Sequence, residues 1–120
     1  MADVMSKVCV FRHLPRSQLE QLVSGSQRRL YRQGDKVVLQ GERGSHFFVV
    51  AQGEVQVIVD GTVVRCYGRY SYFGERAILF DEPRAATVKV ASDQAEIWAL
   101  DRDVFMQVVG EKTLTNDLLR

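Results

Sequence analysis

The chain has 120 residues and a formal net charge of +1, and hydrophobic residues make up 46% of it. This length and composition suit one compact domain with its own core. The near balance of charge argues against a protein that mainly binds nucleic acid, because such proteins carry a strong basic excess. No apolar run approaches the roughly 20 residues of a membrane-spanning helix. Residues 1–7 lack the apolar stretch of a secretory signal, so we expect a cytoplasmic location without membrane insertion.

The first part of the chain, residues 1–29, is predicted to be a helical segment. Over residues 8–23, apolar side chains recur at helical spacing, and Pro15 suits the first position of a helix. The basic cluster of Arg28, Arg29 and Arg32 comes next. We expect it to be a solvated strand edge rather than a nucleic-acid patch.

Residues 30–100 carry the pattern of a β-barrel. Residues 54–59 alternate so that three valines share one face of a strand, and Asp60-Gly61 is a strong signal for a two-residue hairpin. Many short strands with glycine turns at even spacing are typical of a jelly roll or barrel. The expected strands are 36–39, 47–50, 54–59, 62–67, 86–91 and 95–100.

A closing helix is predicted after the last strand. Asp101 can cap a helix from residue 102 to about residue 109, and Gly110 can end it. Residues 101–120 would then begin a set of C-terminal lid helices. The expected fold class is mainly β with flanking helices, in a single domain over residues 1–120.

One segment, residues 73–88, interrupts the strand pattern with the sequence FGERAILFDEPRAATV. Gly74 permits close approach of the backbone, and a short helix expected at 76–79 would begin with N–H groups that can bind an anion. Arg84 offers a planar fork of donors that fits phosphate oxygens. Glu75 can accept hydrogen bonds from sugar hydroxyls. The residues alone therefore indicate a site for a sugar phosphate or a similar anion, or an internal salt bridge between Glu75 and Arg84.

Other reactive residue types in the chain show no pattern of catalysis or metal binding. Cys9 and Cys66 lie far apart, and we expect two reduced, partly buried thiols. His13 and His46 have no paired ligand spacing, which argues against a metal-dependent jelly-roll enzyme of the cupin kind. The acidic residues Asp35, Asp81 and Glu82 have no nucleophile or base partner in the sequence, and we expect them to be solvated in loops.

Residues 73–88 resemble the phosphate-binding cassette of the cyclic-nucleotide-binding domain family, with its Phe-Gly-Glu and Arg-Ala-Ala motifs. The resemblance covers nearly the whole chain and implies a jelly-roll β-barrel with an inserted short phosphate-binding helix. Before the cassette it rests on Gly34-Asp35, Gly41-Glu42, Gly44, Phe47-Phe48 and Gly53.

The resemblance also implies a role for individual residues. Glu75 would accept a hydrogen bond from the ribose 2′-hydroxyl, and Arg84 would pair with the cyclic phosphate. Backbone N–H groups of Gly74, Ala77 and Ala85 would complete the anion site. The cyclic nucleotide would be an allosteric ligand, with no other cofactor, no metal and no catalytic residue.

Two residues favour different purines. Ala85 stands where members that prefer cGMP often have Thr or Ser, and so resembles the cAMP-binding type. Arg65 stands where some cGMP-selective members place an arginine on the guanine edge, and an arginine can donate to both O6 and N7 of guanine. The alternative for Arg65 is an exposed strand residue without this role.

The cassette, with Arg76 and the Asp-Glu-Pro-Arg stretch at 81–84, looks most like regulatory domains of apicomplexan cGMP-dependent protein kinases. Residues 10–14 fit the domain just before the kinase. This resemblance favours cGMP and implies an adjoining kinase catalytic domain and sibling cyclic-nucleotide domains as partners, with autoinhibition relieved by movement of the C-terminal helices. The chain itself has no kinase motifs, so we expect no catalytic activity in it. The alternatives are the cAMP-binding domain of a cAMP-dependent protein kinase regulatory subunit, or a degenerate interaction module of the same fold.

Overall fold

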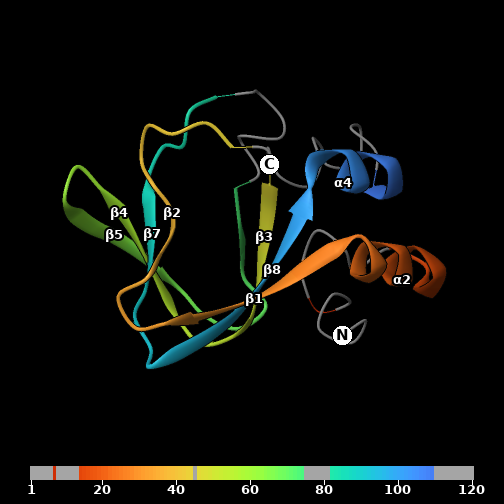
Figure 1. Cartoon of the computed structure of the whole chain (residues 1–120), viewed down its shortest axis with the longest axis horizontal. Coiled ribbons are helices and arrows are strands. Elements are labelled where there is room, and N and C mark those ends of the chain that lie inside the picture. Colours follow the sequence, from red (N-terminus) through yellow and green to blue (C-terminus); the bar gives the residue numbers. More distant parts are fainter. Residues whose placement is uncertain (1–6, 8–13, 45, 75–81, 110–120) are drawn as a thin grey trace.

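The computed structural model describes residues 7, 14–44, 46–74 and 82–109, and two antiparallel β-sheets face each other across its core (Figure 1). The first sheet has the order β1–β8–β3–β6, with bounds Ser26–Arg32, Gln94–Asp101, His46–Gln52 and Tyr72–Phe73. The second has the order β2–β7–β4–β5, with bounds Lys36–Val38, Thr87–Val90, Val55–Val59 and Thr62–Tyr67. These mostly β layers confirm the predicted fold class.

The core lies between the sheets because apolar residues alternate along the strands. From β3, Phe48 and Val50 point inward, while Phe47 and Val49 point to the opposite face of the same sheet. The buried residues of the central cluster are Phe48, Val50, Val55, Phe73, Val88, Val90, Ala95, Ile97 and Ala99.

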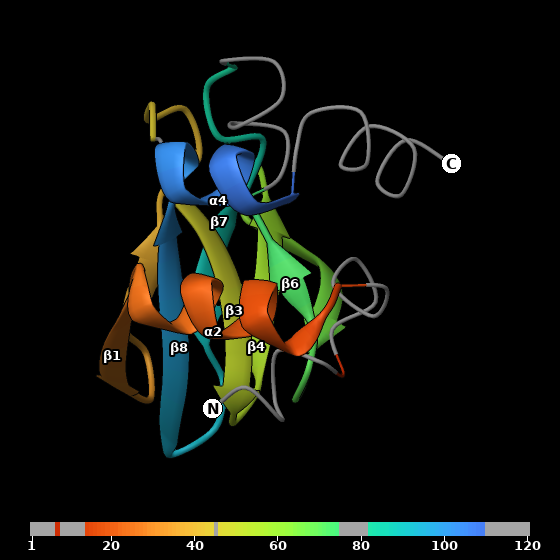
Figure 2. The same ribbon diagram turned by 90° about the vertical axis from the view of Figure 1, so that its right-hand side faces the viewer.

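Helices α2 (Arg16–Ser24) and α4 (Arg102–Val109) cover the outer face of the first sheet (Figures 1 and 2). The rings of Phe47 and Phe105 lie 4.5 Å apart between centroids, and neither side chain is exposed to solvent. The backbone N–H of Asp103 donates to Oδ1 of Asp101 at 2.8 Å, which confirms the predicted cap. Neither helix has the length and apolar character needed to cross a membrane, and the same holds for the rest of the described chain.

The hairpin between β4 and β5 forms where the sequence predicts it. Asp60 has a φ of 51° and Gly61 a φ of 81°. Positive φ at both central residues is the requirement of a type I′ turn, which matches the twist of the flanking strands. The predicted bounds of the return strand, 62–67, are those of β5.

Some local predictions differ from the structure. Strand β1 begins at Ser26, so residues 26–29 are extended although they were expected in the helical segment. Pro15 has an extended backbone with ψ 155° and precedes the helix instead of occupying its first turn. Cys66 is exposed rather than partly buried, because it lies on the edge strand β5. Cys9 and Gly110 lie outside the described residues.

Candidate functional site

A pocket of about 150 Å³ opens between the end of β6 and the start of β7. One wall is formed by the chain that enters β7 and by the last residues around β6, and the other wall is the inner face of the second sheet. The lining residues of these walls are, in turn, Pro83, Arg84, Ala85, Ala86, Phe73 and Gly74, and then Val38, Val57, Tyr67 and Val88. The pocket thus brings three of the predicted site residues together: Gly74, Arg84 and Ala85.

The side chain of Arg84 is the buried cation of this pocket. It is 8% exposed, and no other charged residue in the described part of the chain is buried. Its Nη2 donates to the carbonyl oxygen of His46 at 3.1 Å, and its Nη1 lies 3.5 Å from the carbonyl oxygen of Gly74. The guanidinium also lies over the ring of Phe48, 5.6 Å from the centroid. These contacts fix a planar set of donors at the wall of the pocket.

The backbone of Arg84 is fixed as well. Its N–H donates to the carbonyl of Glu42 at 2.7 Å, and its carbonyl accepts from the N–H of Gly41 at 2.8 Å. Two short hydrogen bonds therefore tie Arg84 to the loop between β2 and β3. These bonds involve main-chain groups only, so the residue types in the sequence do not reveal them.

Two glycines make room for the guanidinium. A Cβ on Gly44 would lie 2.5 Å from Nη2 of Arg84 and 2.8 Å from its Nε. A Cβ on Gly74 would lie 2.8 Å from Nη1 of Arg84 and 2.8 Å from the carbonyl oxygen of His46, and Gly74 has a φ of 92°. Any side chain at either position would displace the arginine or the backbone around it.

Arg65 lies at the end of a row of residues that crosses the inner face of the second sheet. Strand register pairs Val38 with Val88, Val88 with Val57, and Val57 with Arg65. The three valines line the pocket, and residues paired across antiparallel strands share one face of the sheet. The exposed Arg65 therefore shares the face of the pocket, on the edge strand β5, without being part of its lining.

The other predicted site residues, Glu75 and Ala77, lie outside the described residues, as does the short helix expected at 76–79.

The sequence analysis did not identify the apolar wall of the pocket or Tyr67. Strand alternation could have found Tyr67, because it is two residues from Arg65 on the same strand.

The described residues outside the pocket show no other candidate for chemistry. Within them, no group of three or more His, Cys, Asp or Glu side chains could hold a metal ion. Asp35 accepts a hydrogen bond from the backbone N–H of Arg32 at 2.8 Å, so its carboxylate stabilises the turn between β1 and β2.

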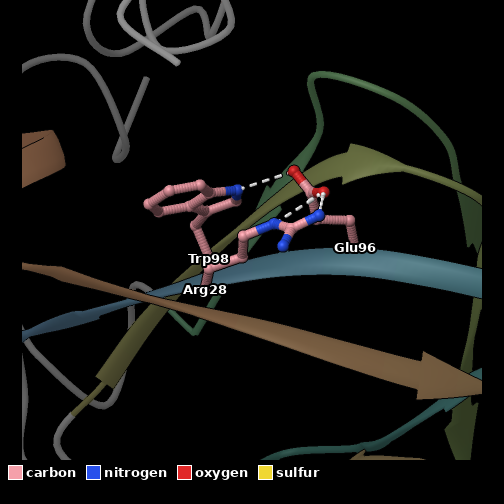
Figure 3. A network of polar contacts seen from close by, with 3 residues as sticks. All are labelled: Arg28, Glu96 and Trp98. Carbon is pink, nitrogen blue, oxygen red and sulfur yellow. Dashed lines mark hydrogen bonds and ion pairs between the residues drawn. The ribbon is translucent and has the colours of Figure 1, made fainter.

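A polar network on the outer face of the first sheet joins β1 to β8 (Figure 3). Nε and Nη2 of Arg28 donate to one carboxylate oxygen of Glu96 at 2.9 and 2.7 Å, and Nε1 of Trp98 donates to the other at 2.9 Å. The hydrogen bond from Trp98, followed by that from Arg28, lowers the pKa of Glu96. The network is separate from the pocket. Arg28 is exposed on β1, which is an edge strand of the first sheet, as predicted.

Comparison with known proteins places this geometry in a family. The family model of the cyclic nucleotide-binding domain matches residues 28–112. A cGMP-dependent protein kinase of Eimeria tenella is 40% identical over 94% of this chain, which spans 11% of that kinase. A cAMP-dependent protein kinase regulatory subunit of Debaryomyces hansenii is 34% identical over 92% of this chain and 25% of the subunit.

The solved structures include a close match in fold. The regulatory domain of Toxoplasma gondii PKA, in a co-crystal with cAMP, superposes with a TM-score of 0.85 and is 28% identical. The match covers 93% of this chain and 44% of that one. The chain spans only a small part of the two curated relatives named above, 11% of the kinase and 25% of the regulatory subunit.

Proposed function

The chain belongs to the cyclic nucleotide-binding domain family, and we propose that its pocket binds cGMP as the regulatory module of a cGMP-dependent serine/threonine protein kinase. The partner would be the kinase catalytic domain, alongside sibling cyclic-nucleotide domains, in the cytoplasm. The observation that carries the proposal is the buried guanidinium of Arg84 at the wall of a pocket whose other side is apolar. A buried cation fits an anionic ligand, and the apolar wall fits a sugar and a base.

The roles within the site follow from this placement. Arg84 pairs with the cyclic phosphate, and the backbone N–H groups of Gly74, Ala77 and Ala85 complete the anion site. Glu75 accepts a hydrogen bond from the ribose 2′-hydroxyl. The support for these roles is that Gly74, Arg84 and Ala85 meet in one pocket, and that the cassette motif supplies Glu75 and Ala77 at the expected positions in the sequence.

The preference for cGMP rests on Arg65. Adjacent strands lie about 4.8 Å apart, so β5 is about 10 Å from β7, where the chain that carries Arg84 enters the sheet. A ligand whose phosphate lies at Arg84 extends along the row of valines toward Arg65, which can donate to the O6 and N7 of guanine. The relative from Eimeria tenella, a cGMP-dependent kinase, supports the same preference.

The alternative function is that of a cAMP-binding domain in a regulatory subunit of a cAMP-dependent protein kinase. Ala85 favours it, since this position lacks the hydroxyl that reaches the guanine amino group in many cGMP-binding relatives. The fold match to a PKA regulatory domain crystallised with cAMP also favours it.

Isothermal titration calorimetry with cGMP and cAMP distinguishes these functions. We expect tighter binding of cGMP, a loss of at least about 10- to 150-fold for both ligands in Arg84→Ala, and a larger loss for cGMP than for cAMP in Arg65→Ala. Arg32→Ala is the matched control, because Arg32 is an exposed strand arginine on the other sheet.

Each contrary outcome has a definite meaning. Tighter binding of cAMP assigns the domain to the alternative function. Undiminished binding in Arg84→Ala refutes the proposed site, and no binding of either nucleotide by the unaltered chain refutes the proposed function and leaves the degenerate module.

In the proposed mechanism, ligand binding at Arg84 moves the C-terminal helices, and this movement relieves inhibition of the kinase. The support lies in β3, where the carbonyl of His46 contacts Arg84 while the next residue, Phe47, packs on Phe105 of α4. The longer protein tests this step: a kinase assay should show activation by cGMP that is lost in Arg84→Ala.

A further inference from the structure

Tyr67 lies outside the cassette motif at residues 73–88, yet it lines the pocket. It is half-buried at the end of β5, lines the pocket and packs against the central core cluster. Its hydroxyl makes no hydrogen bond within the described part of the chain, so it is available to a bound ligand. A tyrosine hydroxyl in a pocket wall can form a hydrogen bond with a bound ligand.

The position of Tyr67 relative to Arg84 defines what it can contact. Tyr67 pairs with Val55, and Arg65 pairs with Val57, so both β5 side chains share the inner face of the sheet. Strand β5 lies two strands beyond β7, a separation of about 10 Å. The pocket lining therefore combines a cationic group on the chain that enters β7, valines of the second sheet, and a phenol on the edge strand β5.

We propose that Tyr67 is a ligand-binding residue, whose hydroxyl forms a hydrogen bond with the part of the nucleotide that lies away from the phosphate. Its ring forms the apolar floor beneath that part. This inference rests on the proposed function, because it assumes that the phosphate lies at Arg84. It differs from the role of Arg65, which is an exposed cation at the rim, since Tyr67 is a neutral group within the lining.

The substitution Tyr67→Phe tests the hydroxyl alone, because it leaves the ring in place. We expect the affinity for the better-bound of cGMP and cAMP to fall about 2- to 10-fold, the loss expected for one neutral hydrogen bond. Tyr67→Leu also removes the ring and should weaken binding further. Tyr31→Phe is the matched control: Tyr31 is another half-buried tyrosine that packs against the same core cluster, but it does not line this pocket.

Calorimetry gives the affinities, and thermal unfolding of the ligand-free chain shows whether each variant is folded. If the unaltered chain binds a nucleotide and Tyr67→Phe binds it equally well, the inference about Tyr67 is wrong while the proposed function stands. An equal loss in Tyr31→Phe also overturns the inference, because the effect then belongs to the core. Absence of binding by the unaltered chain rejects the proposed function itself.

Discussion

The close contact between Gly44 and Arg84 gives a sharp test of how the site is built. In Gly44→Ala, the new Cβ would lie 2.5 Å from Nη2 and 2.8 Å from Nε of Arg84, well inside ordinary contact distance. Gly44 has no positive φ, so the alanine backbone itself is not strained. The guanidinium must therefore move by on the order of 1 Å to reach a normal contact distance.

This movement should weaken ligand binding. It disrupts the 3.1 Å hydrogen bond from Nη2 to the carbonyl of His46 and the stacking over Phe48, and it takes the donors away from their position at the pocket wall. A hydrogen bond that involves a charged group contributes about 1.5–3 kcal/mol. Loss of one such bond to the phosphate lowers affinity by about 10- to 150-fold.

The assay is calorimetric titration with cGMP and cAMP, with thermal unfolding measured on the same ligand-free samples. Gly68→Ala is the matched control, because a Cβ at Gly68 meets no atom within 4 Å and its φ is not positive. We expect Gly68→Ala to bind as the unaltered chain does. Full affinity in Gly44→Ala would refute the argument that the position of Arg84 depends on the absence of a side chain at residue 44.

Two further predictions concern stability. Phe105→Ala removes a side chain with no exposed surface that packs on Phe47, and should lower the free energy of unfolding by about 3–5 kcal/mol in urea denaturation; a loss below about 1 kcal/mol would show that α4 contributes little to the fold. Glu96→Gln tests the network with Arg28 and Trp98. Because the pKa of folded Glu96 lies below its ordinary value of 4.5, the carboxylate stabilises the fold above that pH, and this stabilisation is lost as pH falls through the lowered pKa. The difference in urea midpoint between the unaltered chain and Glu96→Gln should therefore shrink on acidification, and a constant difference would contradict this role.

The sequence predicted those strands whose two faces differ in polarity. Strand β4 and the turn at Asp60-Gly61 were found because alternation and positive φ leave clear residue patterns. The start of β1 was missed, since Gln27 and Arg29 are polar although register places them opposite the buried Ala99 and Ile97. An edge strand with charged residues on both faces shows no alternation in hydrophobicity.

The site was predicted only in part for a related reason. Arg84 was found because its side chain carries the chemistry. The carbonyls of His46 and Glu42 that hold it are main-chain groups, which any residue could supply in principle. The space beside it depends on the absence of a side chain at Gly44, and the sequence does not show that Arg84 lies there. A residue pattern can suggest a ligand group, but only the structure shows what orients it.

Three consecutive residues of β3 contact two different parts of the molecule. His46 contacts Arg84 through its carbonyl, Phe48 lies beneath the guanidinium, and Phe47, between them, supports α4 through Phe105. If a ligand binds more tightly to one arrangement of this strand than to another, thermodynamic reciprocity requires that whatever holds α4 in that arrangement tightens ligand binding by the same factor. A partner that binds α4 would then change the affinity of the site for the nucleotide, and the nucleotide would change the affinity for the partner, with no contact between the two.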